Sequence, residues 1–188
     1  MYGLRARTDF AKDVVEYGPI GENKLKMILE EKGHRYADIS NDERFRIFDI
    51  DILQFNDAVT TASDVLNAYH YNRSAKDVNA VSYEVKTDTY GRISRNIVYE
   101  DISNSSSGCM ARTRADYLYY VFIDENKVIV EEFLIEVRKL RRWLMENFEK
   151  INRCDYLKSK SMRRGADNTA IFLINIEKLI EEKVATKI

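Results

Sequence analysis

A carboxylate and an ammonium stand two residues apart in a segment that otherwise has the composition of a buried strand, Val81 to Thr87. Because side chains alternate between the two faces of an extended chain, Glu84 and Lys86 point to one face, and Tyr83 and Val85 point to the other. Burying charges on a sheet costs free energy unless they have a partner or a task. Glu84 can bind a hard cation, and Lys86 can orient a water or offset charge on a phosphate. A salt bridge on the strand is the simpler alternative.

A second acid, Glu22, stands near the start of a helix that the sequence predicts from Gly21 to Lys32, with Gly33 ending it. At about 100° per residue, Glu22 falls at the edge of the apolar stripe of this helix. The stripe consists of Leu25, Ile28 and Leu29. A first-turn acid that complements the helix dipole is the alternative explanation for this glutamate.

Two aspartates, Asp49 and Asp51, lie in a segment that we predict to be a strand, Arg44 to Phe55, and the two-residue alternation puts them on one face. Aspartate is depleted in strands, so a pair in the middle of one needs a reason. A strand end that is exposed to water would be such a reason. A shared metal site would be another.

Taken together, the acids and the lysine are a sufficient set for metal-dependent hydrolysis of a phosphodiester. Two or three carboxylates and a backbone carbonyl would bind Mg²⁺, with Mn²⁺ as a substitute, and waters would complete the octahedron. A metal so bound polarises the phosphate and lowers the pKa of a water that attacks phosphorus. Lys86 would orient that water or stabilise the developing charge.

The order Glu22, Asp51, Glu84-Val85-Lys86 resembles the PD-(D/E)XK nuclease superfamily, which includes restriction enzymes and Holliday-junction resolvases. The stretch Tyr83 to Glu100 is similar to small phage-type nucleases of this superfamily, in which a Gly/Ser-Asn turn and a strand ending in glutamate follow the motif strand. The segment Ser107-Gly108 to Tyr117 is similar to their Ser-Gly … Thr-x-Ala-Asp-Tyr stretch. The resemblance covers roughly Gly21 to Ile123.

The resemblance implies an α/β fold: a restriction-endonuclease-like three-layer sandwich with a mixed central sheet flanked by helices. It implies a Mg²⁺-dependent endodeoxyribonuclease in which Asp51, Glu84 and the Val85 carbonyl bind the metal and Lys86 is catalytic. Glu22 matches the helix acid that many members add to the metal shell. The Asp-Ile-Asp run leaves Asp49 and Asp51 both open as the ligand. We favour Asp51, because similar sequences commonly place this acid before an apolar pair, here Ile52-Leu53.

The 188 residues predict a single domain, 1–188, with one long connection. Asp51 and Glu84 are 33 positions apart, whereas small members of the superfamily usually join these strands by a shorter turn. We therefore expect residues 56–80 to be an insertion, helical over Ala62 to Tyr71, that serves as an arm for dimerisation or for substrate grip. A homodimer suits an enzyme that cuts two strands with one site each.

Periodicity and turn residues predict the remaining elements. The predicted strands are Asn96–Ile102, Asp116–Ile123, Val128–Val130 and Ala170–Asn175, and the predicted helices are 133–151 and Ile176–Lys183. Turns are expected at Asp88–Gly91 and Asp124–Lys127.

The formal net charge of −1 gives no overall basic field, so contacts with DNA must come from local clusters. We expect Lys160, Arg163 and Arg164 to form one cluster, and Arg92 and Arg95, with neighbouring Asn96, to form a second. Such groups contact the DNA backbone and do not read base sequence. Several tyrosines could stack on bases, although strand tyrosines are more often core residues. They are Tyr69, Tyr71, Tyr117, Tyr119 and Tyr120.

Composition argues against several other classes of protein. Two cysteines and two histidines, all far apart, make a zinc site or a disulfide framework improbable. The charged N-terminal residues do not resemble a signal peptide, and no apolar run approaches the roughly 20 residues that cross a bilayer. We expect a cytoplasmic protein that binds DNA and no membrane. Two alternatives to a nuclease stay open: an inactive nuclease fold that serves as a DNA-binding or assembly subunit, and an interaction domain whose charged strand is only surface.

Overall fold

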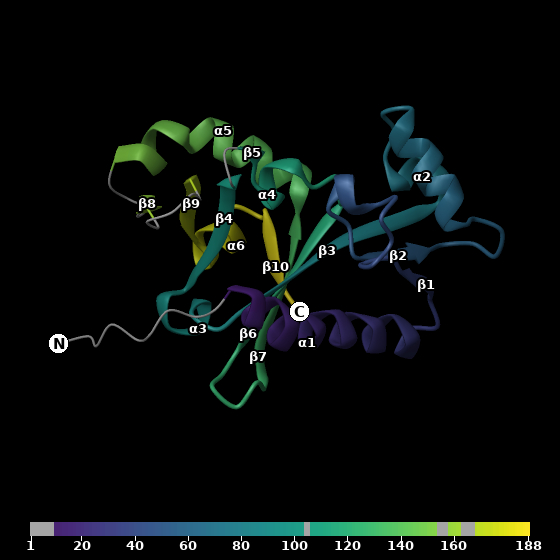
Figure 1. The fold of residues 1–188 in the computed structure, drawn as a ribbon, viewed down its shortest axis with the longest axis horizontal. Coiled ribbons are helices and arrows are strands. Elements are labelled where there is room, and N and C mark those ends of the chain that lie inside the picture. The colour runs from purple at the N-terminus through teal and green to yellow at the C-terminus, as the bar shows by residue number, and fades with distance from the viewer. Residues whose placement is uncertain (1–9, 104–105, 154–157, 163–167) are drawn as a thin grey trace.

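The computed structural model describes residues 10–103, 106–153, 158–162 and 168–188, which form two β-sheets and several helices (Figure 1). A mixed six-stranded sheet has the strand order β1-β2-β3-β6-β7-β10, and a four-stranded sheet has the order β5-β4-β9-β8. The strands of the larger sheet are β1 (Arg35–Asp38), β2 (Ile52–Phe55), β3 (Ala80–Asp88), β6 (Tyr117–Ile123), β7 (Ile129–Glu136) and β10 (Ala185–Lys187). Those of the smaller sheet are β4 (Asn96–Ser103), β5 (Ser106–Ser107), β8 (Lys158–Met162) and β9 (Asn168–Asn175).

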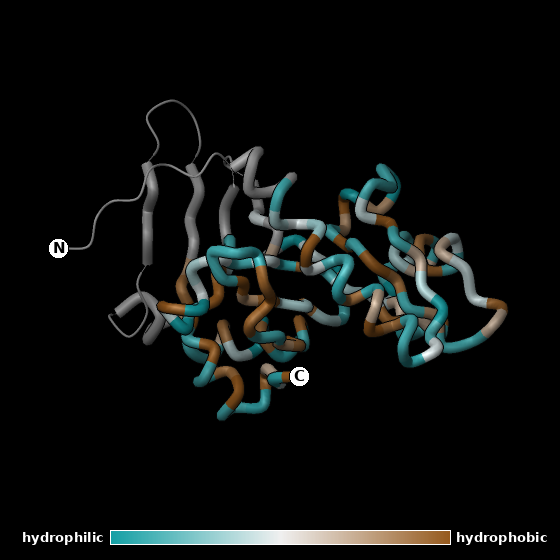
Figure 2. The backbone as a smooth tube through the Cα atoms, turned by 90° about the horizontal axis from the view of Figure 1, so that it is seen from below, coloured by the Kyte–Doolittle hydropathy of each residue, from teal (hydrophilic) through white to brown (hydrophobic). Residues whose placement is uncertain are grey.

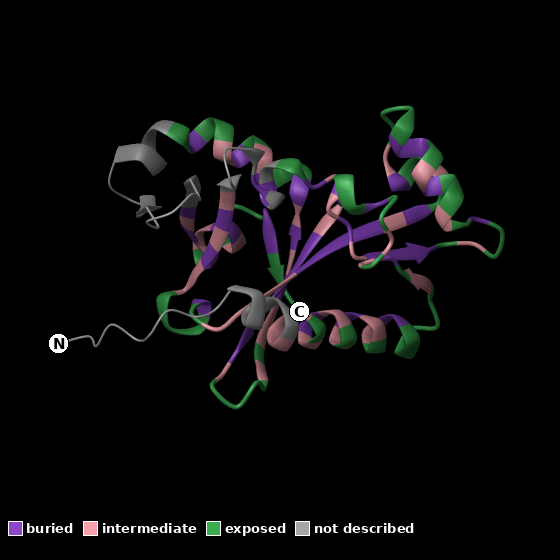
Figure 3. Ribbon diagram, in the orientation of Figure 1, coloured by how far each residue is buried: buried purple, intermediate pink, exposed green. Residues whose placement is uncertain are grey.

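The six-stranded sheet is covered on both faces. Helix α1 (Phe10–Glu31) packs on one face, where Leu25 and Leu29 contact a cluster that includes Val85 and Val121. Helices α2 (Ala62–His70) and α5 (Val137–Arg153) and the four-stranded sheet share an apolar cluster with the other face (Figures 1 and 3). The chain is therefore an α/β protein with layers on either side of a mixed sheet, as predicted.

Strand β3 lies in the interior of the larger sheet, and its prediction from Val81 to Thr87 is confirmed. It pairs antiparallel with β2, where Ile52 is opposite Tyr83, and parallel with β6, where Glu84 is opposite Leu118. A strand with neighbours on both edges and layers on both faces is buried, which explains its apolar composition. Glu84 and Lys86 are thus carried by a central strand of the sheet.

Helix α1 begins earlier than the predicted start at Gly21, and it contains Pro19. Gly18, Pro19 and Gly21 disfavour a helix interior, which is why the sequence predicts a later start. The predicted end at Gly33 is confirmed: this residue has φ of +70°, and the next amide, that of His34, bonds the Leu29 carbonyl at 2.8 Å. A glycine in the left-handed region after a helix is a common terminating signal.

The predicted strand from Arg44 to Phe55 is wrong over its first part. Residues Arg46–Phe48 form a 3₁₀ helix (η1), and only Ile52–Phe55 pairs as β2. Phe45 and Phe48 are buried while Ile47 is 62% exposed, which is the spacing of a tight helical turn. Strand β1, at the edge of the sheet, was not predicted.

The predicted helix over residues 133–151 starts too early. Phe133 and Ile135 are buried in alternation with less buried neighbours and belong to β7, so α5 begins at Val137. A strand that runs directly into a helix has no turn residue between the two, and apolar spacing alone therefore misplaces the boundary. Strands β8 and β10 were also not predicted, and the last helix, α6, spans Ile176–Glu181.

Residues 56–80 form the predicted helical connection between β2 and β3. Helix α2 has a capping box between Thr61 and Asp64, and a 3₁₀ helix, η2 (Ala75–Val78), returns the chain to β3. Val65 and Tyr69 bury this segment against the face of the sheet that α1 does not cover. That residues 56–80 are an insertion stays a prediction.

Apolar and polar residues alternate at short intervals along the described chain (Figure 2). Accordingly, none of the helices in the described ranges is both long enough and apolar enough to cross a membrane.

The closest approach of α1 to the sheet occurs at Gly21, and it predicts opposite effects of two alanine substitutions in this helix. A Cβ at Gly21 would lie 2.7 Å from Thr87 Oγ1 and 2.8 Å from Val85 Cγ1, whereas a Cβ at Gly18 would meet only Glu22 Oε1 at 4.0 Å. We expect Gly21→Ala to destabilise the fold by about 1–3 kcal/mol. Gly18→Ala should stabilise it by roughly 0.5–1 kcal/mol through helix propensity.

Urea denaturation of the two variants and the wild type measures this difference, and Gly18→Ala serves as the matched control. Equal unfolding free energies for the two variants would contradict the close packing of α1 on β3.

Candidate active site

The site lies where β2 begins and β3 continues past it. The register of β2 and β3 ends with Ile52 opposite Tyr83, and Asp51 immediately precedes this pair. The Asp51 amide donates to the Tyr83 carbonyl at 2.9 Å, and the Val85 amide donates to Asp51 Oδ2 at 2.8 Å. The Asp51 carboxylate therefore accepts the bond that a backbone carbonyl would accept if the ladder continued, and this contact brings it close to Glu84.

Glu84 is a buried acid, only 4% exposed. Burial raises its pKa to about 8, and the neighbouring charge of Asp51 adds to the rise, while Lys86 opposes it. Burial likewise raises the pKa of Asp51, against the lowering effect of the Val85 amide. The two carboxyl groups are close enough for a protonated Glu84 to hydrogen-bond Asp51. This position does not fit a charged strand that is only surface, and it excludes that alternative for Glu84.

Lys86 lies on the same side of β3, and its Nζ is 2.6 Å from Glu84 Oε1. Its side chain is 31% exposed, so the lysine is partly open to solvent beside the buried acid. The register neighbour of Lys86 on β6 is Tyr120, whose hydroxyl donates to Asp88 at 2.7 Å and accepts from the Val98 amide at 3.1 Å. This hydroxyl connects the end of β3 to β4 and fixes the strand on which the lysine stands.

Glu22 approaches from α1. It is half-buried, and its pKa is raised by burial first and then by the charges of Asp51 and Asp38. Asp38 accepts from Lys26 Nζ at 2.8 Å and from Ser40 Oγ at 2.7 Å. Sequence reasoning missed Asp38 and Ser40, because it did not predict β1, which ends at Asp38 and is followed by Ser40.

Asp49 is not part of a strand, so the alternation that predicts a face shared with Asp51 does not apply, although its charge helps to raise the pKa of both Asp51 and Glu84. It adopts the left-handed conformation, with φ of 44°, at the end of η1. Arg112 Nη2 donates to its Oδ1 at 2.8 Å, and the Thr113 hydroxyl donates to its carbonyl at 2.6 Å. The structure thus brings Asp51 to Glu84 and pairs Asp49 with Arg112, the last residue of α4 (Cys109–Arg112).

The arginines predicted to contact DNA after the motif strand are paired with acids. Arg92, in α3 (Gly91–Ser94), bonds Glu125 at 2.9 Å, and Arg95 forms ion pairs with both Glu131 and Glu177. These contacts tie the α3 turn to β7 and α6. We therefore do not place a DNA-binding surface there.

The other residues predicted to contact DNA are less informative. Asn96 begins β4, opposite Asn175. Lys160 is in β8, where its backbone pairs with Ala170 of β9. The side chain of Lys160 and the residues Arg163 and Arg164 lie outside the described part of the chain. Of the tyrosines considered for stacking, Tyr69, Tyr119 and Tyr120 are buried in the core.

A divalent cation fits the donor set, although the described residues hold no group of three or more acidic, histidine or cysteine side chains arranged around one point. Mg²⁺ is commonly bound by one or two carboxylates while waters fill its other positions. Asp51 and Glu84 supply that pair. In a strand the N–H and C=O of one residue point to the same edge, so the Val85 carbonyl faces the same side as the amide that bonds Asp51.

Comparison with protein-family models, with curated proteins and with solved structures finds no match for this chain. The mixed six-stranded sheet with helices establishes the α/β class, and membership of the PD-(D/E)XK superfamily stays a prediction from the sequence.

The raised pKa of Glu84 predicts how the stability of the metal-free protein depends on pH. The folded protein keeps the Glu84 proton up to about pH 8, whereas the unfolded chain releases it near the ordinary value of 4.5. The stabilisation is therefore complete below about pH 4.5 and is lost as pH rises to about 8. Relative to Glu84→Gln, which carries no titrating proton, the wild type should lose unfolding free energy up to pH 8 and then level off.

Chemical denaturation of both proteins in a chelator, at intervals from pH 5 to pH 9, measures this difference. A difference that is constant across the range would show that Glu84 is already ionised in the fold.

Proposed function

We propose that this protein is a metal-dependent DNA endonuclease of the restriction-endonuclease-like type, a member of the PD-(D/E)XK superfamily. The observation that supports the proposal best is the adjacency of a buried carboxyl group, Glu84, and a half-buried one, Asp51, at the start of β2. The Val85 amide holds Asp51 at 2.8 Å, and Lys86 Nζ lies 2.6 Å from Glu84. This is the acid, acid and lysine set that the sequence resemblance implies.

Electrostatics supports a cationic ligand at this position. The two carboxylates lose hydration and repel each other, and both effects raise their pKa values. A single lysine, itself partly exposed, does not offset two such charges. A divalent cation would satisfy both carboxylates at once, which is a reason for a fold to retain an otherwise unfavourable pair.

Each residue then has a distinct role. Asp51 and Glu84 would hold Mg²⁺ or Mn²⁺ together with the Val85 carbonyl, and Glu22 would extend the acidic shell from α1. The bound metal would polarise the scissile phosphate and lower the pKa of a coordinated water. Lys86, which is partly open to solvent, would orient the attacking water and stabilise negative charge on the phosphate.

Cleavage of DNA tests the proposal. We expect Mg²⁺ or Mn²⁺ to support hydrolysis of labelled duplex, single-stranded or branched DNA by the wild type, and a chelator to abolish it. Glu84→Ala and Lys86→Ala should each lower the rate by at least about 10²-fold, since each removes a charge that acts in the transition state. Gel analysis of end-labelled substrates gives the rates.

Glu31→Ala is the matched control, because Glu31 is an exposed glutamate at the end of α1. Circular dichroism of every variant separates loss of catalysis from loss of fold. A wild-type protein that binds these DNAs but cleaves none of them with either metal would support the inactive DNA-binding or assembly subunit instead.

Metal binding distinguishes the two aspartates of the Asp-Ile-Asp run. Because Asp51 adjoins Glu84 whereas Asp49 pairs with Arg112, Asp51→Asn should abolish the rise in melting temperature that Mn²⁺ causes. Asp49→Asn should keep that rise, although loss of the ion pair lowers the starting melting temperature. Thermal unfolding of each variant with and without Mn²⁺ measures the shift. The opposite pattern would assign the ligand to Asp49.

A further inference from the structure

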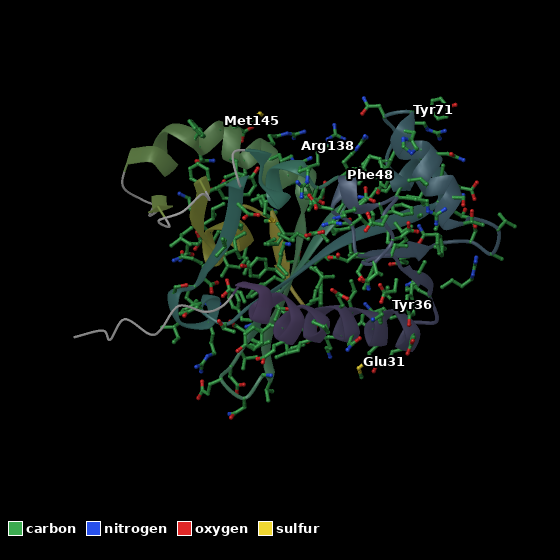
Figure 4. The ribbon with its side chains drawn as sticks, in the orientation of Figure 1. Glu31, Tyr36, Phe48, Tyr71, Arg138 and Met145 are labelled. Atoms are coloured by element: carbon green, nitrogen blue, oxygen red, sulfur yellow. The ribbon has the colours of Figure 1, made fainter. Side chains whose placement is uncertain are left out.

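A group of arginines lies on the elements that cover the second face of the larger sheet, the face opposite α1. Glu84 and Lys86 point to this face, because Tyr83 and Val85 belong to the apolar cluster under α1. Residues of α2, η1 and α5 all pack on it. In Figure 4, Tyr71 at the end of α2, Phe48 in η1 and Arg138 in α5 lie along one side of the molecule. The four-stranded sheet packs on this face as well, and its strand β4 reaches the register neighbour of Lys86 through the bond from the Val98 amide to Tyr120. A substrate that lies along α2, η1 and α5 would approach Lys86 from this same face.

Arg114 joins the α2 segment to the body of the protein. Its guanidinium donates to the Tyr69 carbonyl at 3.1 Å and to Asn72 Oδ1 at 3.1 Å, and it lies over the rings of Phe48 and Tyr69. Arg73, in the same segment, donates to the Asp77 carbonyl at 2.9 Å. All these hydrogen-bond acceptors are neutral oxygens, although the charge of Arg73 also helps to lower the pKa of the nearby Asp77.

The arginines continue from Arg114 to α5. Arg141 donates to the carbonyl of Thr113, the residue whose hydroxyl bonds the Asp49 carbonyl. The charge of Arg114 also helps to lower the pKa of Arg141, after burial, so the two cations are neighbours. Thr113 thus places the first turns of α5 next to the turn that leads from η1 to Asp51.

Arg138 and Arg142 stand on either side of Arg141 on α5, and both are exposed. Within the part of the chain that the structure describes, neither forms an ion pair with an acid, unlike Lys139, which bonds Glu136 at 3.0 Å. Side chains at i and i+4 lie on the same side of a helix, so these two guanidinium groups can reach one extended ligand. They extend the positive charge of Arg73 and Arg114 along α5.

We propose that Arg73, Arg114, Arg138 and Arg142, here called the arginine band, bind the phosphate backbone of DNA and present it to Lys86. This inference rests on the proposed function and names the surface that serves the same site. The band differs from the DNA-binding residues that the sequence predicts, of which Arg92 and Arg95 are neutralised by acids. Guanidinium groups suit phosphates, because their planar donors match phosphate oxygens.

Salt-dependent binding of DNA by the intact protein in a chelator, where cleavage does not occur, tests the band. Each phosphate contact contributes about one unit to the slope of log Kd against log salt. The double variant Arg138→Ala/Arg142→Ala should bind a labelled duplex more weakly than the wild type, with a slope that is smaller by about two. Arg138→Lys/Arg142→Lys should recover most of the slope, because it restores the charge.

The matched control is Lys32→Ala/Lys183→Asn, which removes the same charge at two exposed lysines that form no ion pair with the described residues. Asparagine suits position 183, where the backbone is left-handed with φ of 57°. The inference is overturned if the α5 double variant and the wild type have the same slope of log Kd against log salt. It is also overturned if the wild type binds no DNA. The proposed function is judged separately, by cleavage in Mg²⁺. Cleavage that persists with an unchanged slope refutes the band alone, and a reduced slope without any cleavage by the wild type refutes the nuclease alone.

Discussion

The hydrogen bond from the Val85 amide to the Asp51 carboxylate, at 2.8 Å, closes the end of β2 onto the middle of β3. β2 pairs only from Ile52, so the amide of Val85 has no strand partner on this side and takes a side chain in its place. The bond to this side chain brings Asp51 close to Glu84, which stands on a central strand. Burial raises the pKa values of both acids, their proximity adds to the rise, and the proposed cation depends on this proximity.

The surrounding layers hold this arrangement in place against electrostatic repulsion. Gly21 lets α1 approach β3 so closely that any side chain would meet Val85 and Thr87. The same approach brings Glu22 to the side of Asp51. On the opposite face, η1 and Arg112 fix the turn that delivers Asp51. The site is thus built between a helix and a turn that both depend on the packing of β3.

Much of this could be predicted from the sequence, because it follows from local patterns. The strand of Glu84 and Lys86 and the stop of α1 at Gly33 rest on alternation and turn chemistry, whereas the choice of Asp51 as a ligand rests on motif order and stays a prediction. The stretch before Asp51 could not be predicted, because a 3₁₀ turn and a short strand contain the same apolar residues. The ion pair of Asp49 with Arg112 joins residues far apart in sequence, and no local rule brings them together.

The arginine band could not be predicted from the sequence either, because its members are far apart along the chain. Arg73 and Arg114 are separated from Arg138 and Arg142 by whole strands, so their charges have no common pattern in the sequence. The clusters that are adjacent in sequence, such as Arg92 with Arg95, instead pair with acids on other elements. Net charge near zero conceals this division, and only the fold separates neutralised cations from those left available to a polyanion.

Calorimetric titration of the protein with Mn²⁺ at pH 7, repeated in buffers of different ionisation enthalpy, tests the central claim most directly. Because the pKa of Glu84 is raised to about 8, the metal-free site holds a proton at this pH. Binding of the cation between Asp51 and Glu84 should release about one proton, and Glu84→Gln should abolish both the binding and the release. Binding without proton release would show that Glu84 is already ionised in the metal-free fold, and binding that survives in Glu84→Gln would contradict a metal site built on this pair.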